Sequence, residues 1–253
     1  MVFTDSHIFI HCPKTGGTFL RSVLVTECGG KDSGGGHDPA FFLESQAGMA
    51  SVGARRLVGV VRRPCDFYVS LYTHARRNGT GYDAQLGLWG NGSVEFRDVL
   101  YGWTHPDEVW EMPLSLGVVF GAAGHKDVDI IESGVGFASW AARYFYGRLG
   151  AAKGPCEPEW LADTLVPTDR LYDACEPLLG VPVTEESHPR VNTRASMGAV
   201  NLTARGPLDP QDWFTDDEMV EWVSKADAEL IALMGWPAPF EPARNPYVHL
   251  GAN

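Results

Sequence analysis

The sequence predicts a single α/β domain in which a parallel sheet is flanked by helices. Short apolar runs at 8–10 and 57–61 are each followed by a loop and then by apolar residues at helical spacing. We expect a third strand at 164–166, followed by a helix at 169–179. Repetition of strand, loop and helix is typical of parallel strands joined by helices that cover a sheet. The chain has 253 residues, of which 44% are hydrophobic, and this suffices for one domain with a substantial core.

The expected elements follow from local signals along the chain. Pro64 suits the first turn of a helix, because its missing N–H needs no partner there. Residues 215–218 read T-D-D-E and suit a helix start, while Gly235 and Pro237 suit the end of that helix. Glycine-rich stretches mark loops too short to separate domains, so residues 1–253 form one domain. We expect strands at 6–11, 57–61 and 164–166, and helices at 17–26, 65–77, 135–147, 169–179 and 215–234.

The first loop, at 11–18, reads H-C-P-K-T-G-G-T and joins the first strand to the first helix. A glycine-containing loop at a helix start points backbone N–H groups at an anion, and the helix dipole favours negative charge there. Lys14 adds a positive charge, and Thr15 and Thr18 add hydroxyl groups. The pattern indicates a phosphate or sulfate site, with an ordinary strand-to-helix turn as the alternative. It differs from the Walker loop, because its lysine precedes the glycines.

A second strand-to-helix junction carries Arg62. The segment 57–72 reads L-V-G-V-V-R-R-P-C-D-F-Y-V-S-L-Y, so Arg62 stands where the strand ends and Ser70 lies two turns into the helix. Both junctions follow the carboxyl ends of strands, where open α/β sheets bind ligands. A guanidinium at that place can bind a second phosphate through two hydrogen bonds.

These two segments resemble the sulfotransferases that use 3'-phosphoadenosine 5'-phosphosulfate (PAPS). In that family a P-K-[TS]-G-[GST]-[TS] loop holds the 5'-phosphosulfate, and a V-R-[DN]-P-x-x-x-x-x-S-x-Y segment holds the 3'-phosphate. Lys14 matches the lysine of the loop, and Arg62 and Ser70 match the ligands of the 3'-phosphate. Arg63 departs from the family, which has Asp or Asn there. The resemblance assigns nucleotide binding to Lys14, Thr15, Gly16, Gly17, Thr18, Phe19, Arg62 and Ser70.

The resemblance continues further along the chain. The segment 163–180 looks like the late strand and helix of the family. Residues 188–196, H-P-R-V-N-T-R-A-S, are similar to the H-x-N-x-[ST]-x-R stretch of its carbohydrate-type branch, with a longer spacing between the histidine and the asparagine. This likeness assigns Arg194 and Ser196 to a loop that closes over the nucleotide. The segment 79–126 matches no part of the family, and we expect it to be an insertion that forms the acceptor site.

Large apolar residues of this middle segment are candidates for the acceptor site. Aromatic rings form apolar or sugar-stacking pockets, although the same residues equally suit a core. We expect the acceptor to be a small molecule or a sugar that carries a hydroxyl group. The candidate residues are Trp89, Trp103, Trp110, Met112 and Phe120.

The resemblance implies a sulfotransferase fold, with a P-loop-like parallel sheet, and an enzyme that moves the sulfuryl group of PAPS to an acceptor hydroxyl. The product is 3'-phosphoadenosine 5'-phosphate (PAP). Lys14 and the loop amides would stabilise charge on the leaving phosphate. The acceptor must lose a proton, so a general base is needed. Three side chains are candidates for the base: His37, Asp38 and His74.

Charge and cysteine content argue against other classes of protein. The net charge of −12 argues against nucleic-acid binding and weighs against a highly sulfated polysaccharide acceptor. The five cysteines show no C-x-x-C spacing, which favours reduced thiols in a cytoplasmic protein. We find no signal peptide, membrane-spanning segment or metal-binding histidine set. We therefore expect a cytoplasmic enzyme with no metal, membrane or nucleic-acid partner.

Two other classes of protein share such loops. A P-loop kinase-like phosphotransferase would place glycines before the lysine and an acidic magnesium ligand at a strand end, and we identify neither feature. A kinase-like phosphotransferase would bind ATP rather than PAPS, which distinguishes it from a sulfotransferase. A catalytically inactive relative would bind the nucleotide but show no turnover.

Overall fold

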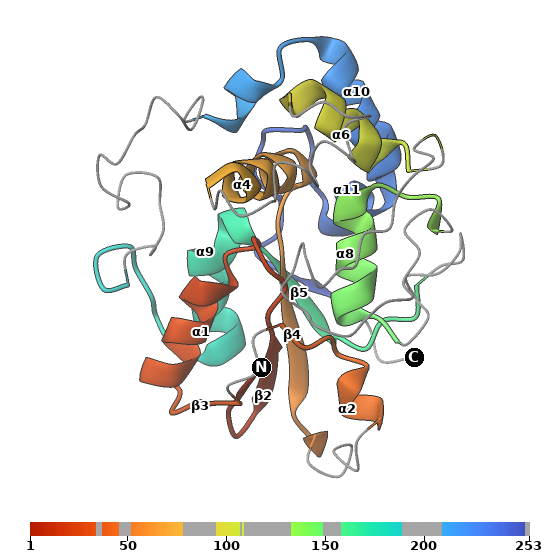
Figure 1. Cartoon of the computed structure of the whole chain (residues 1–253). Helices are drawn as coiled ribbons and strands as arrows, with labels where there is room; N and C mark the ends of the chain where they lie inside the picture. Colours follow the sequence, from red (N-terminus) through yellow and green to blue (C-terminus); the bar gives the residue numbers. More distant parts are fainter. Residues whose placement is uncertain are drawn as a thin grey trace.

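The computed structural model describes residues 1–33, 37–45, 52–77, 95–106, 108, 133–148, 158–188 and 209–250. These residues form an α/β structure around a six-stranded sheet with the strand order β3-β1-β2-β4-β5-β6 (Figure 1). The strands are β1 (Val2–Phe3), β2 (His7–Ile10), β3 (Lys31–Asp32), β4 (Arg56–Val61), β5 (Thr164–Pro167) and β6 (Val248–His249).

The prediction of a parallel sheet is correct for the centre and wrong for the outer strands. β2, β4 and β5 run parallel and correspond to the three predicted strands. β1 pairs antiparallel with both β2 and β3, and β6 pairs antiparallel with β5. Each of these outer strands has only two residues, too few for an apolar pattern to reveal them. The sheet is therefore mixed.

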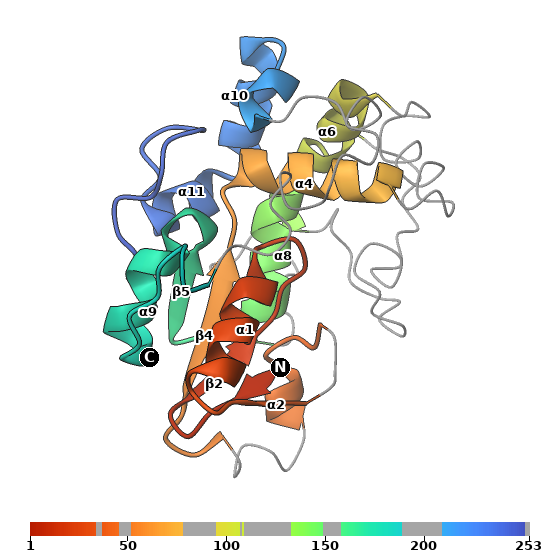
Figure 2. The ribbon, with the colours of Figure 1, turned by 90° about the vertical axis from the view of Figure 1, so that its left-hand side faces the viewer.

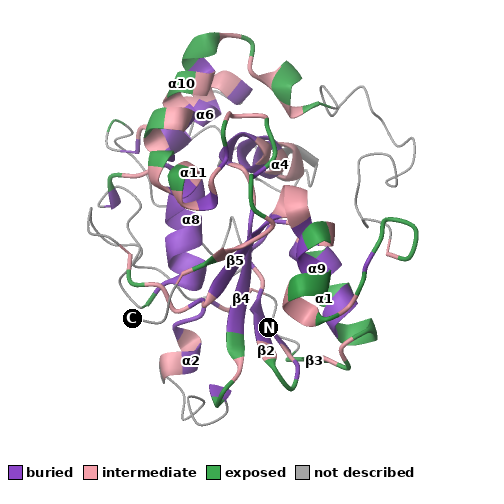
Figure 3. Ribbon diagram, turned by 180° about the vertical axis from the view of Figure 1, so that it is seen from behind, coloured by how far each residue is buried: buried purple, intermediate pink, exposed green. Residues whose placement is uncertain are grey.

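Helices cover both faces of this sheet. The described α-helices are α1 (Gly17–Thr26), α2 (Phe42–Ser45), α4 (Pro64–Arg77), α6 (Phe96–Thr104), α8 (Phe137–Tyr146), α9 (Leu171–Leu179), α10 (Asp217–Ala226) and α11 (Ala228–Met234). α1 and α9 lie on one face and α8 lies on the other, as seen from the front in Figure 1 and from behind in Figure 3. The predicted helices at 17–26, 65–77 and 135–147 are confirmed within two residues at each end. The helix predicted at 169–179 is α9 preceded by a 3-10 turn, η2 (Thr168–Arg170).

Alternate residues of β4 supply the two layers of the core. Leu57 and Val61 belong to the cluster that contains the side chains of α8, whereas Val58 and Val60 belong to the cluster formed with α1 and α9. Successive side chains of a strand point to opposite faces, so one strand serves both layers. All four side chains are buried, which holds the carboxyl end of β4 firmly between the helices.

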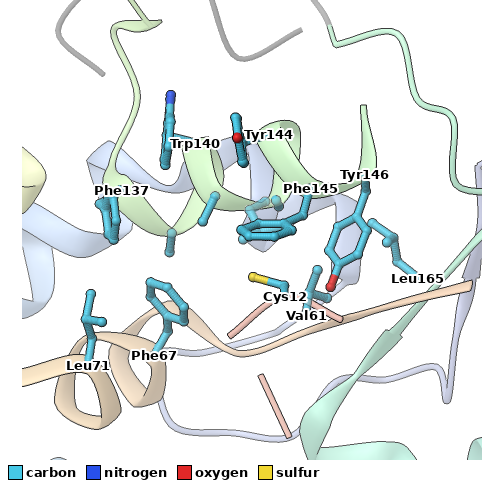
Figure 4. Close-up of a cluster of buried hydrophobic side chains, with 14 of the residues drawn as sticks. Cys12, Val61, Phe67, Leu71, Phe137, Trp140, Tyr144, Phe145, Tyr146 and Leu165 are labelled. Atoms are coloured by element: carbon cyan, nitrogen blue, oxygen red, sulfur yellow. The ribbon is translucent and has the colours of Figure 1, made fainter. Parts of the chain in front are cut away.

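The face of α8 that meets the sheet is aromatic. Figure 4 shows Phe145 and Tyr146 beside Cys12 at the end of β2 and Val61 at the end of β4. A Cβ atom at Gly59 would stand 2.4 Å from the Tyr146 ring, so only glycine admits that ring. The Tyr146 hydroxyl donates to the carbonyl oxygen of Val60 at 2.6 Å. The ring and its hydroxyl therefore anchor α8 to the central strand.

The helix predicted at 215–234 is wrong in one respect, because Asp227 divides it into α10 and α11. The buried Asp227 carboxylate accepts hydrogen bonds from the Tyr68 hydroxyl at 2.7 Å and from the Ser139 amide at 2.7 Å. These donors belong to α4 and α8, and they hold the carboxylate at the break between the two helices. Burial raises the pKa of Asp227 to about 6.

The described part of the predicted insertion contains α6, which packs against α4 and α10. Its Trp103 is 2% exposed and stacks on Tyr68 with ring centroids 5.6 Å apart, so this candidate acceptor residue belongs to the core. The other four candidates, Trp89, Trp110, Met112 and Phe120, lie outside the described residues. Among the described helices, none combines the length and the apolar character needed to cross a membrane.

Candidate phosphate-binding site

The carboxyl ends of the three parallel strands lie along one edge of the sheet. The loop at 11–16 follows β2, Arg62 follows β4, and Thr168 follows β5. Figure 2 shows β4 running to this edge, where α4 begins. Open α/β sheets bind ligands at the carboxyl ends of their strands. Both predicted phosphate motifs therefore occupy the edge of the sheet that suits a ligand, and a third strand end joins them.

The loop after β2 has a left-handed backbone at two residues. Lys14 has a φ of 64° and is the one non-glycine residue of the described chain with positive φ, while Gly16 has a φ of 82°. The left-handed region costs a non-glycine residue about 1–2 kcal/mol. Such turns direct successive backbone N–H groups into a concavity that binds anions. The backbone geometry at Lys14 and Gly16 is thus of a kind that suits an anion-binding loop.

Side chains from the neighbouring strands hold the carbonyl groups of this loop. Arg62 Nη1 donates to the carbonyl oxygen of Lys14 at 3.1 Å. The Thr168 hydroxyl donates to the carbonyl oxygen of Thr15 at 2.5 Å. A trans peptide is planar, so the amides of Thr15 and Gly16 point away from the carbonyls that precede them. The carbonyls of Lys14 and Thr15 are held toward the ends of β4 and β5, so the amides of Thr15 and Gly16 point in the opposite direction, away from those strand ends.

The side chains of Thr15 in the loop and Phe19 in α1 have contacts within the protein. Thr15 is buried, and its hydroxyl donates to the carbonyl oxygen of Cys12 at 2.8 Å. Phe19 is buried against Tyr172 with ring centroids 4.9 Å apart, while Thr18 is exposed. The side chains of Thr15 and Phe19, both predicted to bind nucleotide, therefore stabilise the loop and α1. Any contact that these two residues make with a ligand would come from the backbone.

His11 links the loop to His37. The His11 ring packs on Gly17, where a Cβ atom would stand 2.1 Å from the ring. The His37 ring meets His11 edge-on, with ring centroids 4.6 Å apart, and His37 Nδ1 lies 3.2 Å from the His11 carbonyl oxygen. A carbonyl only accepts hydrogen bonds, so Nδ1 carries the proton. In the neutral ring the lone pair is then on Nε2, the tautomer needed for a base at that nitrogen.

The surroundings of both histidines favour their neutral forms. Burial lowers the pKa of His11 to about 3, and the charges of His37 and Lys14 act in the same direction. Burial also lowers the pKa of His37. The hydrogen bond to the His11 carbonyl and the charge of Asp38 oppose this effect, whereas the charges of the N-terminal amine and Lys14 increase it. A lowered pKa leaves the imidazole unprotonated at neutral pH, as a proton acceptor requires.

The two arginines after β4 have different surroundings. Arg63 donates from Nε and Nη2 to one carboxylate oxygen of Asp66, at 3.0 and 2.8 Å. The charge of the Arg63 guanidinium is thus balanced by the carboxylate of Asp66 in the first turn of α4. The guanidinium of Arg62 instead contacts the loop. Ser70 and His74 follow on α4 one turn apart, and both side chains are partly exposed. Arg63, the residue that departs from the family pattern, is therefore a partner of Asp66.

Two predicted nucleotide ligands, Arg194 and Ser196, lie outside the described residues. Thr168, which neither motif includes, contacts the loop directly, and His11, the first residue of the loop, packs on Gly17. The position of Thr168 at the end of a third parallel strand is the signal that could have revealed it. Comparisons of the chain with family models, with curated proteins and with solved structures yield no significant match.

Proposed function

We propose that the chain is a sulfotransferase that moves the sulfuryl group of PAPS to a hydroxyl of a small-molecule or glycosidic acceptor. The observation that carries this proposal is the hydrogen bond from Arg62 to the carbonyl oxygen of Lys14. It brings the loop suited to a 5'-phosphosulfate into contact with the strand end suited to a 3'-phosphate. A nucleotide with phosphate groups on both sides of its ribose would use both segments.

Each segment supplies a different kind of donor. The amides of Thr15 and Gly16, the start of α1 and the Lys14 ammonium group together favour the 5'-phosphosulfate. Arg62 and Ser70 would bind the 3'-phosphate through charge-assisted hydrogen bonds. Nucleotides that lack the 3'-phosphate would lose the second set of contacts, so the site favours PAPS over ATP.

The transfer step replaces one bond to sulfur with another. The acceptor oxygen forms a bond to sulfur, and the bond between sulfur and the bridging phosphate oxygen breaks. Negative charge grows on that phosphate oxygen, where Lys14 and the loop amides would stabilise it. The proton of the acceptor hydroxyl passes to the general base.

His37 is the base that the surroundings support best. Its contact with His11 leaves Nε2 as the acceptor nitrogen, and its lowered pKa keeps the ring neutral. The contacts of the His37 ring with the ring and the carbonyl oxygen of His11 hold His37 beside the loop. Asp38 and His74 remain competing candidates that variants must test.

Calorimetry with PAP and with adenosine 5'-phosphate tests the nucleotide preference. Loss of charge-assisted contacts costs roughly 1.5–3 kcal/mol, so PAP should bind about tenfold to a hundredfold more tightly. Equal affinities would overturn the proposal. Tighter binding of ATP than of PAP would instead favour a kinase-like phosphotransferase.

Turnover is measured by the release of PAP from PAPS in the presence of a panel of phenolic, alcoholic and sugar hydroxyl compounds. Acceptor-dependent release of PAP supports the proposed reaction. Tight binding of PAP with no turnover across the panel would favour an inactive nucleotide-binding relative.

A further inference from the structure

Thr168 contacts both phosphate-binding segments from the end of β5. Its hydroxyl oxygen lies 2.5 Å from the carbonyl oxygen of Thr15 and 2.9 Å from the carbonyl oxygen of Val61. Thr15 belongs to the loop after β2, and Val61 is the last residue of β4, directly before Arg62. One hydroxyl group therefore joins the backbones of the two segments.

The Thr168 hydroxyl also offsets the repulsion between the carbonyl oxygens of Thr15 and Val61. Two carbonyl oxygens that lie near the same point carry like partial charges, and the shared hydroxyl hydrogen can bond to both as a three-centre hydrogen bond. The methyl group of Thr168 lies beside Gly16. A Cβ atom added to Gly16 would stand 2.9 Å from this methyl carbon, Cγ2. The side chain of Thr168 thus supports the loop by polar contacts and by packing.

We propose that Thr168 is a positioning residue that sets the separation of the two phosphate sites. It acts through the carbonyl of Thr15, which orients the amide of Gly16, and through the carbonyl of Val61, which precedes Arg62. This role rests on the proposed function, because it concerns a nucleotide with two phosphate groups. A ligand held at two places gains affinity only when the two places match its own geometry.

The role is tested with Thr168→Val and Thr168→Ser, which separate the hydroxyl from the volume of the side chain. Calorimetry gives the affinities of PAP, adenosine 5'-phosphate and adenosine 3'-phosphate for each variant. In Thr168→Val, the preference for PAP over both monophosphates should fall about tenfold, as expected for loss of one hydrogen bond. In Thr168→Ser the preference should stay close to that of the unmodified protein. Thr168→Ala, which also lacks the hydroxyl, replaces the valine variant if that variant does not fold.

Thr104→Val is the matched control. Thr104 is another threonine whose hydroxyl donates to a carbonyl, that of Leu100 within α6 at 2.9 Å. Its removal should lower the melting temperature without altering the ratio of the nucleotide affinities.

The outcomes distinguish this role from the proposed function. If the unmodified protein has no preference for PAP, the proposed function and the role of Thr168 both fail. If that preference exists and Thr168→Val retains it, only the role of Thr168 fails. A serine variant as impaired as the valine variant would also contradict the role, because the hydroxyl alone would then not be enough to maintain the preference.

Discussion

The segments after β2 and β4 lie at the same edge of one sheet, yet they are built differently. After β2 the backbone is strained, and the carbonyls of Lys14 and Thr15 are bound by side chains of other strands. After β4 only Arg62 and Arg63 precede α4, and the proposed phosphate ligands are the side chains of Arg62 and Ser70. Recognition by main-chain amides depends on whatever holds the loop, whereas recognition by side chains depends on the residues themselves.

This difference explains why substitutions should act differently in the two segments. In the first segment, residues outside the motif such as Thr168 can matter as much as residues within it. In the second, a single guanidinium carries most of the effect. The predictions below test this contrast, starting with the largest expected change.

His37→Ala should cause the largest loss, because His37 is the proposed base beside the first segment. A general base contributes typically 10²–10⁴-fold, so single-turnover transfer should slow on the order of that factor while PAP affinity barely changes. In the unmodified protein the rate should increase with pH as the imidazole loses its proton. The lowered pKa of His37 places the midpoint below 6.5.

His7→Ala is the control, since His7 lies at the opposite end of β2. If Asp38→Asn or His74→Ala abolishes transfer while His37→Ala does not, the base belongs to one of those residues. Loss of transfer in the His74 variant alone would show that the base lies on α4, in the second segment. The contrast between the two segments would then be wrong.

Lys14→Ala and Lys14→Gly together separate the charge of Lys14 from its strained backbone. Both variants lack the ammonium group, so turnover should fall on the order of a hundredfold in each. Glycine accepts the φ of 64° without strain, so Lys14→Gly should be more stable than Lys14→Ala by about 1 kcal/mol. Urea unfolding followed by circular dichroism gives the difference in free energy of unfolding. Near-normal turnover in either variant would remove the lysine from the mechanism.

Arg62→Ala and Arg63→Ala form a pair of neighbouring arginines with opposite expectations. Arg62→Ala should weaken PAP binding about tenfold to a hundredfold and should affect adenosine 5'-phosphate less. Arg63→Ala removes the partner of Asp66 and should lower stability with little change in the preference for PAP. The reverse pattern in calorimetry would show that the motif had been aligned one residue out of place.

The sequence predicted the elements that carry the site better than it predicted their surroundings. Strand, loop and helix around Lys14 and Arg62 were found because buried strands and amphipathic helices leave clear periodic patterns. The contact between Arg62 and the Lys14 carbonyl is consistent with the rule that parallel strands end at one edge. The two contacts of Thr168 were missed, because they depend on the register that pairs Val61 with Pro167, although the place of Thr168 at a strand end was readable from the sequence. The helix break at Asp227 was missed because its cause, the Tyr68 hydroxyl, lies far away in sequence.

The buried hydrogen bond between Tyr68 and Asp227 also has a consequence for the order of folding. Its partners are 159 residues apart, so the chain between them must close a large loop before the bond can form. The Ser139 amide binds the same carboxylate across 88 residues. During synthesis, α4 and α8 emerge well before α10, and their buried donors gain this acceptor only when the C-terminal helices dock. During synthesis, α10 and α11 can therefore dock onto α4 and α8 only after most of the chain has been made.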